Sequence, residues 1–213
     1  MYFFETRPFN AINAIREKIR RAGLVALDVF CLSFLLSMAL ENQWRASAGE
    51  TSKPHDLSKQ IELAKTIAAS ELVRNGVLKH NSELSAEHKE LTNLSWKHLG
   101  ATDRKVKDLA ENPIAKFLKD SFPKYVTEVF VSGKDGKKVA FTRRTTSWDH
   151  TGKDKHEIPM KNTVWQGSIE RDESTGVHQI QIAVPVFHEG SAIGSMVVGI
   201  SIVNLERSQG TKP

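Results

Sequence analysis

The sequence contains very little cysteine, because Cys31 is the only one among 213 residues. A disulfide framework is therefore excluded. An excess of charge of one sign is also missing, since 30 Lys and Arg residues face 25 Asp and Glu residues, for a formal net charge of +5. Such an excess is too small to indicate a nucleic-acid-binding protein. With 39% hydrophobic residues, the chain can form an ordinary globular domain with a real core.

Several motifs of catalysis and cofactor binding are also missing. The sequence has no glycine-rich nucleotide loop and no G-x-S-x-G serine motif. His150 and His156, with Asp149 and Asp154 between them and beside them, can be interpreted as metal ligands or as solvated loop residues. Their spacing matches no H-x-x-x-H or H-E-x-x-H pattern on a predicted helix. We expect no metal, no cofactor and, because no nucleophile is paired with a base, no enzymatic activity.

One long hydrophobic run is present, over residues 22–40. A basic flank precedes it, and Ala46, Ser47 and Ala48 follow it after a short polar segment. This order is typical of a secretory signal peptide, because signal peptidase accepts only small side chains at two positions before the cut. The pattern predicts that residues 1–48 are a signal peptide, gripped at Ala46 and Ala48 and cleaved after Ala48.

Two alternatives remain for this run: an uncleaved membrane anchor over residues 22–40, or a buried helix of the fold. Asp28 would be costly in a permanent span, and a core helix rarely carries such a basic flank. Lipid attachment at Cys31 is excluded because the bulky Phe30 precedes it. Cleaved or retained, the segment places the rest of the chain outside the cytoplasm, in the periplasm or an equivalent extracytoplasmic space.

The remainder divides into a helical part and a strand-rich part. Apolar residues follow Asp56, a predicted helix N-cap, at spacings of three and four, which predicts a long first helix. Further helices are predicted from Ser85, over 103–110 and over 114–122. The predicted divisions are residues 49–123 for the helices, 124–205 for the sheet and 206–213 for a disordered tail.

Five strands are predicted after Pro123, each rich in β-branched or aromatic residues. Short glycine-containing turns join the first two as a hairpin and the last three as a meander. The predicted strands cover residues 126–131, 138–142, 165–171, 177–187 and 192–203. We therefore expect an α+β fold with a five-stranded antiparallel sheet.

The fourth predicted strand has two unlike faces. Alternate positions from His178 to Val186 are mostly aliphatic and suit packing against a helix. The intervening positions include Gln179 and Gln181 among small residues. This second face is expected to border a polar pocket or solvent.

The motifs in this region resemble those of the Cache family, also described as PDC-type or PAS-like extracytoplasmic sensor domains. The resemblance covers about residues 95–205. Its most specific segments are 112–118 (NPIAKFL), 125–131 (YVTEVFV), 136–140 (GKKVA), 172–186 (DESTGVHQIQIAVPV) and 190–199 (GSAIGSMVVG). The resemblance implies a PAS-like sheet with a long N-terminal helix and further helices on one face. It implies a ligand pocket on the other face, under the loop between hairpin and meander.

That loop departs from the family pattern. Residues 145–149 (TTSWD) are similar to the family's T-S-D-Y segment, and 152–154 (GKD) to its G-D-E segment, but a lysine replaces the first acid. Residues 156–159 (HEIP) stand where the family has a K-W helix start. An excess of basic residues in the loop can hold a carboxylate or can be solvated surface charge.

The predicted ligand-binding residues come from this loop and from the two strands after it. An indole offers a broad flat surface for a small organic ligand, although Trp148 can equally pin the loop and Trp165 can close the core. The predicted set is Arg143, Thr145, Trp148, Asp149, Trp165, Gln179 and Gln181.

The predicted function is that of an exported, stand-alone Cache-type sensor domain that binds a small molecule. No second hydrophobic segment or output domain follows the sheet before Pro213, so we expect signalling to pass through a membrane-bound kinase or receptor. The alternative is a membrane-tethered or periplasmic interaction subunit without a small ligand. Neither hypothesis includes a nucleic-acid partner.

Overall fold

The computed structural model describes residues 56–171 and 178–210. The predicted signal peptide, its cleavage residues Ala46 and Ala48, and the turn at 172–177 lie outside the described residues. Within the described ranges, no helix has the length and apolar character needed to cross a membrane.

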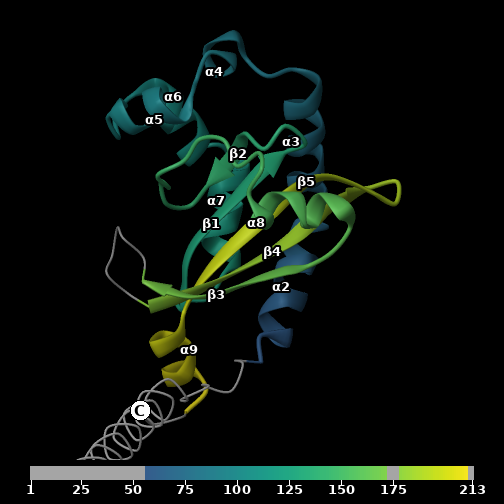
Figure 1. Cartoon of the computed structure of the whole chain (residues 1–213), viewed down its shortest axis with the longest axis vertical. Coiled ribbons are helices and arrows are strands. Elements are labelled where there is room, and N and C mark those ends of the chain that lie inside the picture. The colour runs from purple at the N-terminus through teal and green to yellow at the C-terminus, as the bar shows by residue number, and fades with distance from the viewer. Residues whose placement is uncertain (1–55, 172–177, 211–213) are drawn as a thin grey trace, which may run out of the picture. The chain divides into compact units, whose positions relative to one another are not determined.

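A five-stranded antiparallel sheet forms the centre of the domain, which confirms the predicted fold class (Figure 1). Its strand order, β2-β1-β5-β4-β3, combines a hairpin with a meander, as the turn lengths predicted. The strands are β1 (Val126–Gly133), β2 (Lys138–Phe141), β3 (Trp165–Arg171), β4 (His178–His188) and β5 (Ser191–Ser201).

The helices come mostly before the sheet in the chain. They are α2 (Ser58–Ala68), α3 (Glu71–Ser82), α4 (Ala86–Lys89), α5 (Asn93–His98), α6 (Arg104–Ala110), α7 (Pro113–Ser121), α8 (Asp154–Glu157) and α9 (Ile202–Ser208). The predicted first helix is two helices, because Ser70 leaves the helical conformation and its side chain caps α3 by accepting from the Val73 N–H. Asp56 lies one residue before the N-cap of α2, which is Leu57, and accepts from the Ser58 N–H.

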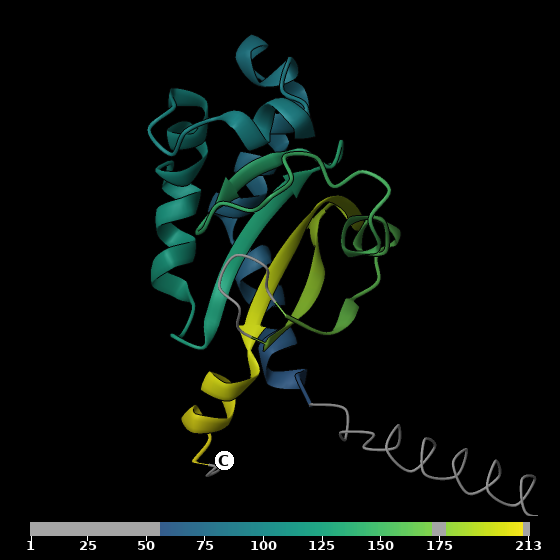
Figure 2. The same ribbon diagram turned by 60° about the vertical axis from the view of Figure 1, so that its left-hand side comes forward.

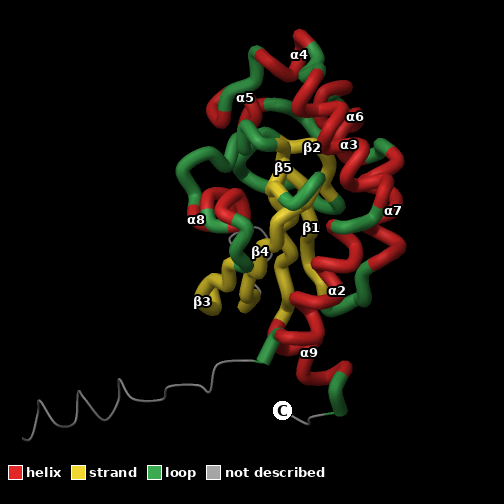
Figure 3. The backbone as a smooth tube through the Cα atoms, turned by 90° about the vertical axis from the view of Figure 1, so that its right-hand side faces the viewer, coloured by secondary structure: helices red, strands yellow, loops and turns green. Residues whose placement is uncertain are grey.

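Helices α2, α3 and α7 cover one face of the sheet (Figures 2 and 3). The predicted aliphatic face of β4 packs there, with Ile180, Ile182, Val184 and Val186 all buried. Gly76 of α3 allows close packing, since a Cβ at that position would lie 2.1 Å from the Ile114 Cδ1. We call this side of the sheet the helix face.

The opposite side carries the loop 142–164 with α8, as Figure 3 shows edge-on. We call it the loop face. Its core is smaller and more aromatic, with Phe130, Phe141, Trp96 and Trp148 among its buried members. Trp96 of α5 lies 5.7 Å from Trp148, centroid to centroid, so the segment around α5 and α6 contributes to this second core.

The C-terminal end of the described chain differs from the prediction. Strand β5 ends at Ser201, and α9 covers residues that were assigned to a longer strand and a disordered tail. Ser201 explains the change, because its hydroxyl accepts from the Asn204 N–H and begins a new helix.

Candidate functional site

A cavity of about 240 Å³ lies on the loop face, between the sheet and the loop that covers it. Strands β1, β3 and β4 supply one wall, and residues 144–155 supply the other. The lining residues are Glu128, Phe130, Arg144, Thr145, Thr146, Ser147, His150, Lys153, Lys155, Glu170, Arg171, Gln179 and Gln181.

A hydrogen-bonded network fixes the side chains on the sheet wall. The Gln181 amide donates to Glu128 Oε1 at 2.7 Å, and the Gln179 amide donates to the same oxygen at 3.4 Å. Thr127 donates to Gln179 Oε1 at 2.7 Å, which sets the orientation of that amide. Lys155 reaches over from α8 and donates to Gln181 Oε1 at 2.9 Å. The wall is therefore a rigid polar surface.

The loop wall is anchored to the rest of the domain. The guanidinium of Arg144 donates to the backbone oxygens of Leu99, at 2.7 Å, and Trp96, which ties the loop to the C-terminal end of α5. Lys153 donates to Ser147 Oγ at 2.8 Å within the loop. These contacts hold the loop over the sheet without help from a ligand.

The ring of Phe130 is surrounded by nitrogen-bearing side chains. His150 stacks on it with centroids 4.5 Å apart, and the Lys155 ammonium lies 5.9 Å from the ring centroid. The Lys138 Nζ lies closer still, at 3.7 Å. Such positions favour cations, because the face of an aromatic ring carries partial negative charge.

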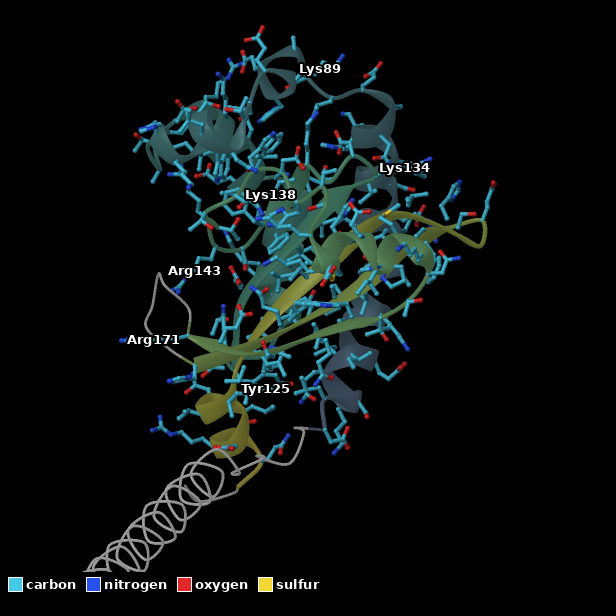
Figure 4. The ribbon with its side chains drawn as sticks, viewed as in Figure 1. Lys89, Tyr125, Lys134, Lys138, Arg143 and Arg171 are labelled. Carbon is cyan, nitrogen blue, oxygen red and sulfur yellow. The ribbon has the colours of Figure 1, made fainter. Side chains whose placement is uncertain are left out.

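Lys138 is the most unusual member of this group. Its side chain is fully buried, and its Nζ has no hydrogen-bond partner among the residues the structure describes. Lys138 does not line this cavity; it lies against the Phe130 ring, which does, and it lines the second cavity described below. In Figure 4 Lys138 lies over the sheet, whereas Arg143 and Arg171 lie at the outer edge of the domain.

Other buried polar atoms without a partner gather in the same region. Within residues 56–171 and 178–210 they include Ser132 Oγ, the cross-strand neighbour of Lys138, together with Trp148 Nε1 and His150 Nδ1. Buried polar atoms normally have hydrogen-bond partners. Their concentration on one side of the sheet marks the loop face as the part of the domain adapted to polar chemistry.

Burial shifts the protonation of these groups. Removal from water lowers the pKa of Lys138 well below its usual value, opposed by Glu128 and reinforced by Lys155 and Lys153. Removal from water also lowers the pKa of Lys155, again opposed by Glu128. The pKa of His150 is lowered chiefly by burial and further by the neighbouring lysines, so its imidazole is neutral at ordinary pH.

Three of the residues predicted from the sequence line the cavity: Thr145, Gln179 and Gln181. The polar face predicted for the fourth strand is therefore where the sequence placed it.

The other predicted residues lie elsewhere. Trp148 is a core residue, buried between Trp96 and His88, with centroids 5.7 and 5.6 Å away. Trp165 packs against the same core and is half-buried. Asp149 accepts from Thr151 in a local turn, and Arg143 is exposed. Arg144, the next residue, lines the cavity in place of Arg143.

Sequence reasoning missed Glu128 and Phe130 on β1 and underrated the lysines. Glu128 and Phe130 alternate along β1 with buried aliphatic residues. That alternation could have placed both of them on the face that lines the cavity. Lys138 gave no local signal, because a lysine beside a hairpin turn is normally exposed.

A second cavity, of about 570 Å³, lies between α3, α4, α6, α7 and strand β2. Some of its polar side chains are engaged: Asn112 donates to the Val139 carbonyl and accepts from the Ala115 N–H, and His80 contacts Asp135 at 3.1 Å. Lys138, whose Nζ has no hydrogen-bond partner among the described residues, also lines this cavity. His88 contacts Ser85 Oγ at 2.6 Å. The walls of this second cavity are more apolar than those of the cavity on the loop face.

Among the described residues, no group of three His, Cys, Asp or Glu side chains is arranged to hold a metal ion.

No protein-family model matches the chain, and no curated protein matches it. Three solved structures illustrate what it is similar to. The sensor domain of the Vibrio cholerae histidine kinase DctB has a TM-score of 0.46 and 13% identity, over 84% of this chain and 60% of that one. The Escherichia coli DcuS sensor domain has a TM-score of 0.44 and 14% identity, over 72% of this chain and 93% of that one.

The ligand-binding domain of the Campylobacter jejuni chemoreceptor Tlp3, in complex with L-valine, has a TM-score of 0.39 and 17% identity, over 74% of this chain and 64% of that one. These structural neighbours are sensor domains. Sensor domains are also the class that the sequence motifs resemble. The chain spans less than two thirds of the DctB and Tlp3 domains.

Proposed function

We propose that this chain is an extracytoplasmic sensor domain of the Cache type that binds a small carboxylate anion in the cavity of the loop face. The observation that carries the proposal is the group of amino groups at the cavity, two of which, from Lys138 and Lys155, lie over the Phe130 ring. Lys138, Lys153 and Lys155 lie in or next to the cavity, and among the described residues none of them forms an ion pair with Glu128 or Glu170.

The size of the cavity supports a small organic acid. A volume of about 240 Å³ equals the liquid-state share of roughly eight water molecules. The Phe130 ring gives an apolar surface for a short carbon chain, and the ammonium of Lys155 lines the cavity, where it can bind a carboxylate. Glutamine amides on the sheet wall add directional hydrogen-bond donors.

Binding without catalysis fits the same geometry. Two histidine–serine contacts occur among the described residues: His88 with its helix-cap residue Ser85, and His156 with Ser195. His156 and Ser195, which border the loop face, are 2.8 Å apart but only 2% and 1% exposed. A substrate has no access to this pair, so it serves to join α8 to β5.

The proposed location outside the cytoplasm rests on the hydrophobic run and its basic flank in the sequence. We propose that a membrane-bound kinase or receptor receives the signal, as the resemblance to Cache-type sensor domains implies.

Thermal unfolding of the full chain with matched ligand pairs tests the binding proposal. Acetate and succinate are compared with acetamide and succinamide, which have the same shapes without charge. At 100 times its dissociation constant, a bound acid stabilises the domain by about 2.7 kcal/mol. We expect stabilisation by at least one acid and none by its amide.

The substitution Lys155→Met removes one ammonium from the lining and should weaken acid binding roughly 10- to 100-fold. Lys161→Met, at an exposed lysine of the same loop, is the matched control and should leave binding unchanged. Equal stabilisation by acids and amides, or no stabilisation by any of the four, would contradict the proposal.

A further inference from the structure

We propose that an anion enters this cavity together with a proton from solvent, and that Lys138 takes up that proton. The inference rests on the proposed function and adds a dependence on pH to it. The neutral amine of Lys138 becomes an ammonium when the anion arrives, with no other bond made or broken.

The surroundings of Lys138 disfavour an ammonium before binding. Its Nζ is buried and unpartnered within the described chain, and the centroid of the Phe130 ring lies 3.7 Å away. Lys138 also lines the second cavity, whose other titratable side chains are Lys79, His80, Glu83, His88 and Asp108. His150 on the covering loop is neutral, and His156 of α8 is turned to Ser195. Lys153 and Lys155, from the start of α8, add positive charge nearby.

Glu128 on β1 is the one carboxylate that favours an ammonium at Lys138. Its Oε1 already accepts from the amides of Gln179 and Gln181, which spread its charge over the sheet wall. The balance of charge around Lys138 before binding is therefore two ammonium groups against one shared carboxylate. These conditions lower the pKa of Lys138.

An anion in the cavity reverses this balance. The cavity is lined by Glu128, Phe130, Lys153 and Lys155, so a carboxylate bound there is separated from Lys138 by little more than one aromatic ring. Its negative charge offsets the two neighbouring ammonium groups and raises the pKa of Lys138. Protonation and anion binding then favour each other, which is a reciprocal coupling.

The expected signature is a pH-dependent affinity. Where the working pH lies between the pKa of Lys138 in the free and the bound domain, the dissociation constant rises about tenfold for each unit of increasing pH. Below that window the affinity is constant, because Lys138 is already protonated. A domain of this kind responds to its ligand more strongly in acid surroundings.

Titration calorimetry of the full chain with succinate tests the inference, run from about pH 6 to about pH 9 in HEPES and in Tris. The difference in heat between the buffers counts the protons exchanged, and we expect uptake of up to about one proton. Lys138→Met should abolish the uptake, and Lys161→Met should retain it. Wild-type protein that exchanges no proton, or releases one, overturns the inference without any variant.

Persistent proton uptake in Lys138→Met also overturns the inference, because the proton then goes to Lys155 or His150.

The two proposals fail in different ways. Succinate binding in preference to succinamide, without proton uptake, leaves the proposed carboxylate-binding function but refutes the coupling. Succinamide binding as tightly as succinate, or absence of binding by either compound, refutes the proposed function as well. If Lys138→Met does not fold, the proton count and pH slope of the wild-type chain decide alone.

Discussion

The two faces of the sheet are built from the same strands but differ in chemistry. On the helix face, aliphatic side chains of β4 and β5 interlock with α2, α3 and α7, and nearly every buried member is apolar. On the loop face, a small aromatic core lies beside a polar cavity and a fully buried lysine. From this difference we expect the helix face to supply most of the stability and the loop face to be less stable because it carries the proposed binding site.

Truncating a buried side chain of the helix face should have the largest effect on the free energy of unfolding. Ile182 is fully buried there, so Ile182→Ala removes packed methylene groups and leaves a cavity, at a cost of about 2 to 5 kcal/mol. The adjacent Gln181, on the loop face, provides the matched control, and Gln181→Ala should cost about 1 kcal/mol. Chemical denaturation measures both. Equal losses in the free energy of unfolding would mean that the two faces contribute equally to stability.

Replacing the buried lysine should change the free energy of unfolding in the opposite direction. Lys138→Met replaces an unpartnered amine by an apolar side chain of similar length and should raise the free energy of unfolding by about 1 to 2 kcal/mol at neutral pH. The unfolded chain binds a proton at Lys138 that the folded chain disfavours, up to the usual pKa of 10.5. The gain should therefore shrink as the pH rises towards that value. A destabilised variant would show that the lysine is part of the structural core.

At neutral pH, the smallest expected effect concerns His150. Because its folded pKa is lowered from 6.5, the unfolded chain gains a proton below that pH and the folded domain does not. Stability should fall as the pH drops below about 6.5, by up to about 1.4 kcal/mol per pH unit from this group. His150→Gln should remove that part of the slope. The lowered pKa of the Asp135 carboxyl acts in a separate window, below 3.8. If the slope of stability against pH is unchanged in the variant, the imidazole of His150 takes up a proton in the folded domain as readily as in the unfolded chain.

The sequence predicts the helix face better than the loop face, for a physical reason. Regular alternation in β4 sorts Ile182 and Gln181 onto opposite faces, and that period of two needs no knowledge of the rest of the chain. The loop has no period. Whether Arg143 or Arg144 turns inward depends on hydrogen bonds to the end of α5, which are distant in sequence.

Trp148 and Lys138 show the same limit. The indole of Trp148 is as suitable for a ligand as for a core, and only the packing of Trp96 and His88 against it decides between them. Lys138 follows a turn and precedes a short strand, where lysine usually points to solvent. Its burial depends on segments distant in sequence, because the loop pairs beside β2 at Lys137 and Asp149 and helices α3, α6 and α7 pack against β2.

Amide resonances of the full chain, followed during titration with succinate, test the division between the two faces most directly. The account predicts that the largest shifts belong to Thr145, Gln179 and Gln181, with residues of the helix face unmoved. Shifts centred instead on the second cavity, at Asn75 and Leu84, with the loop face unmoved, would contradict the assignment of the binding site.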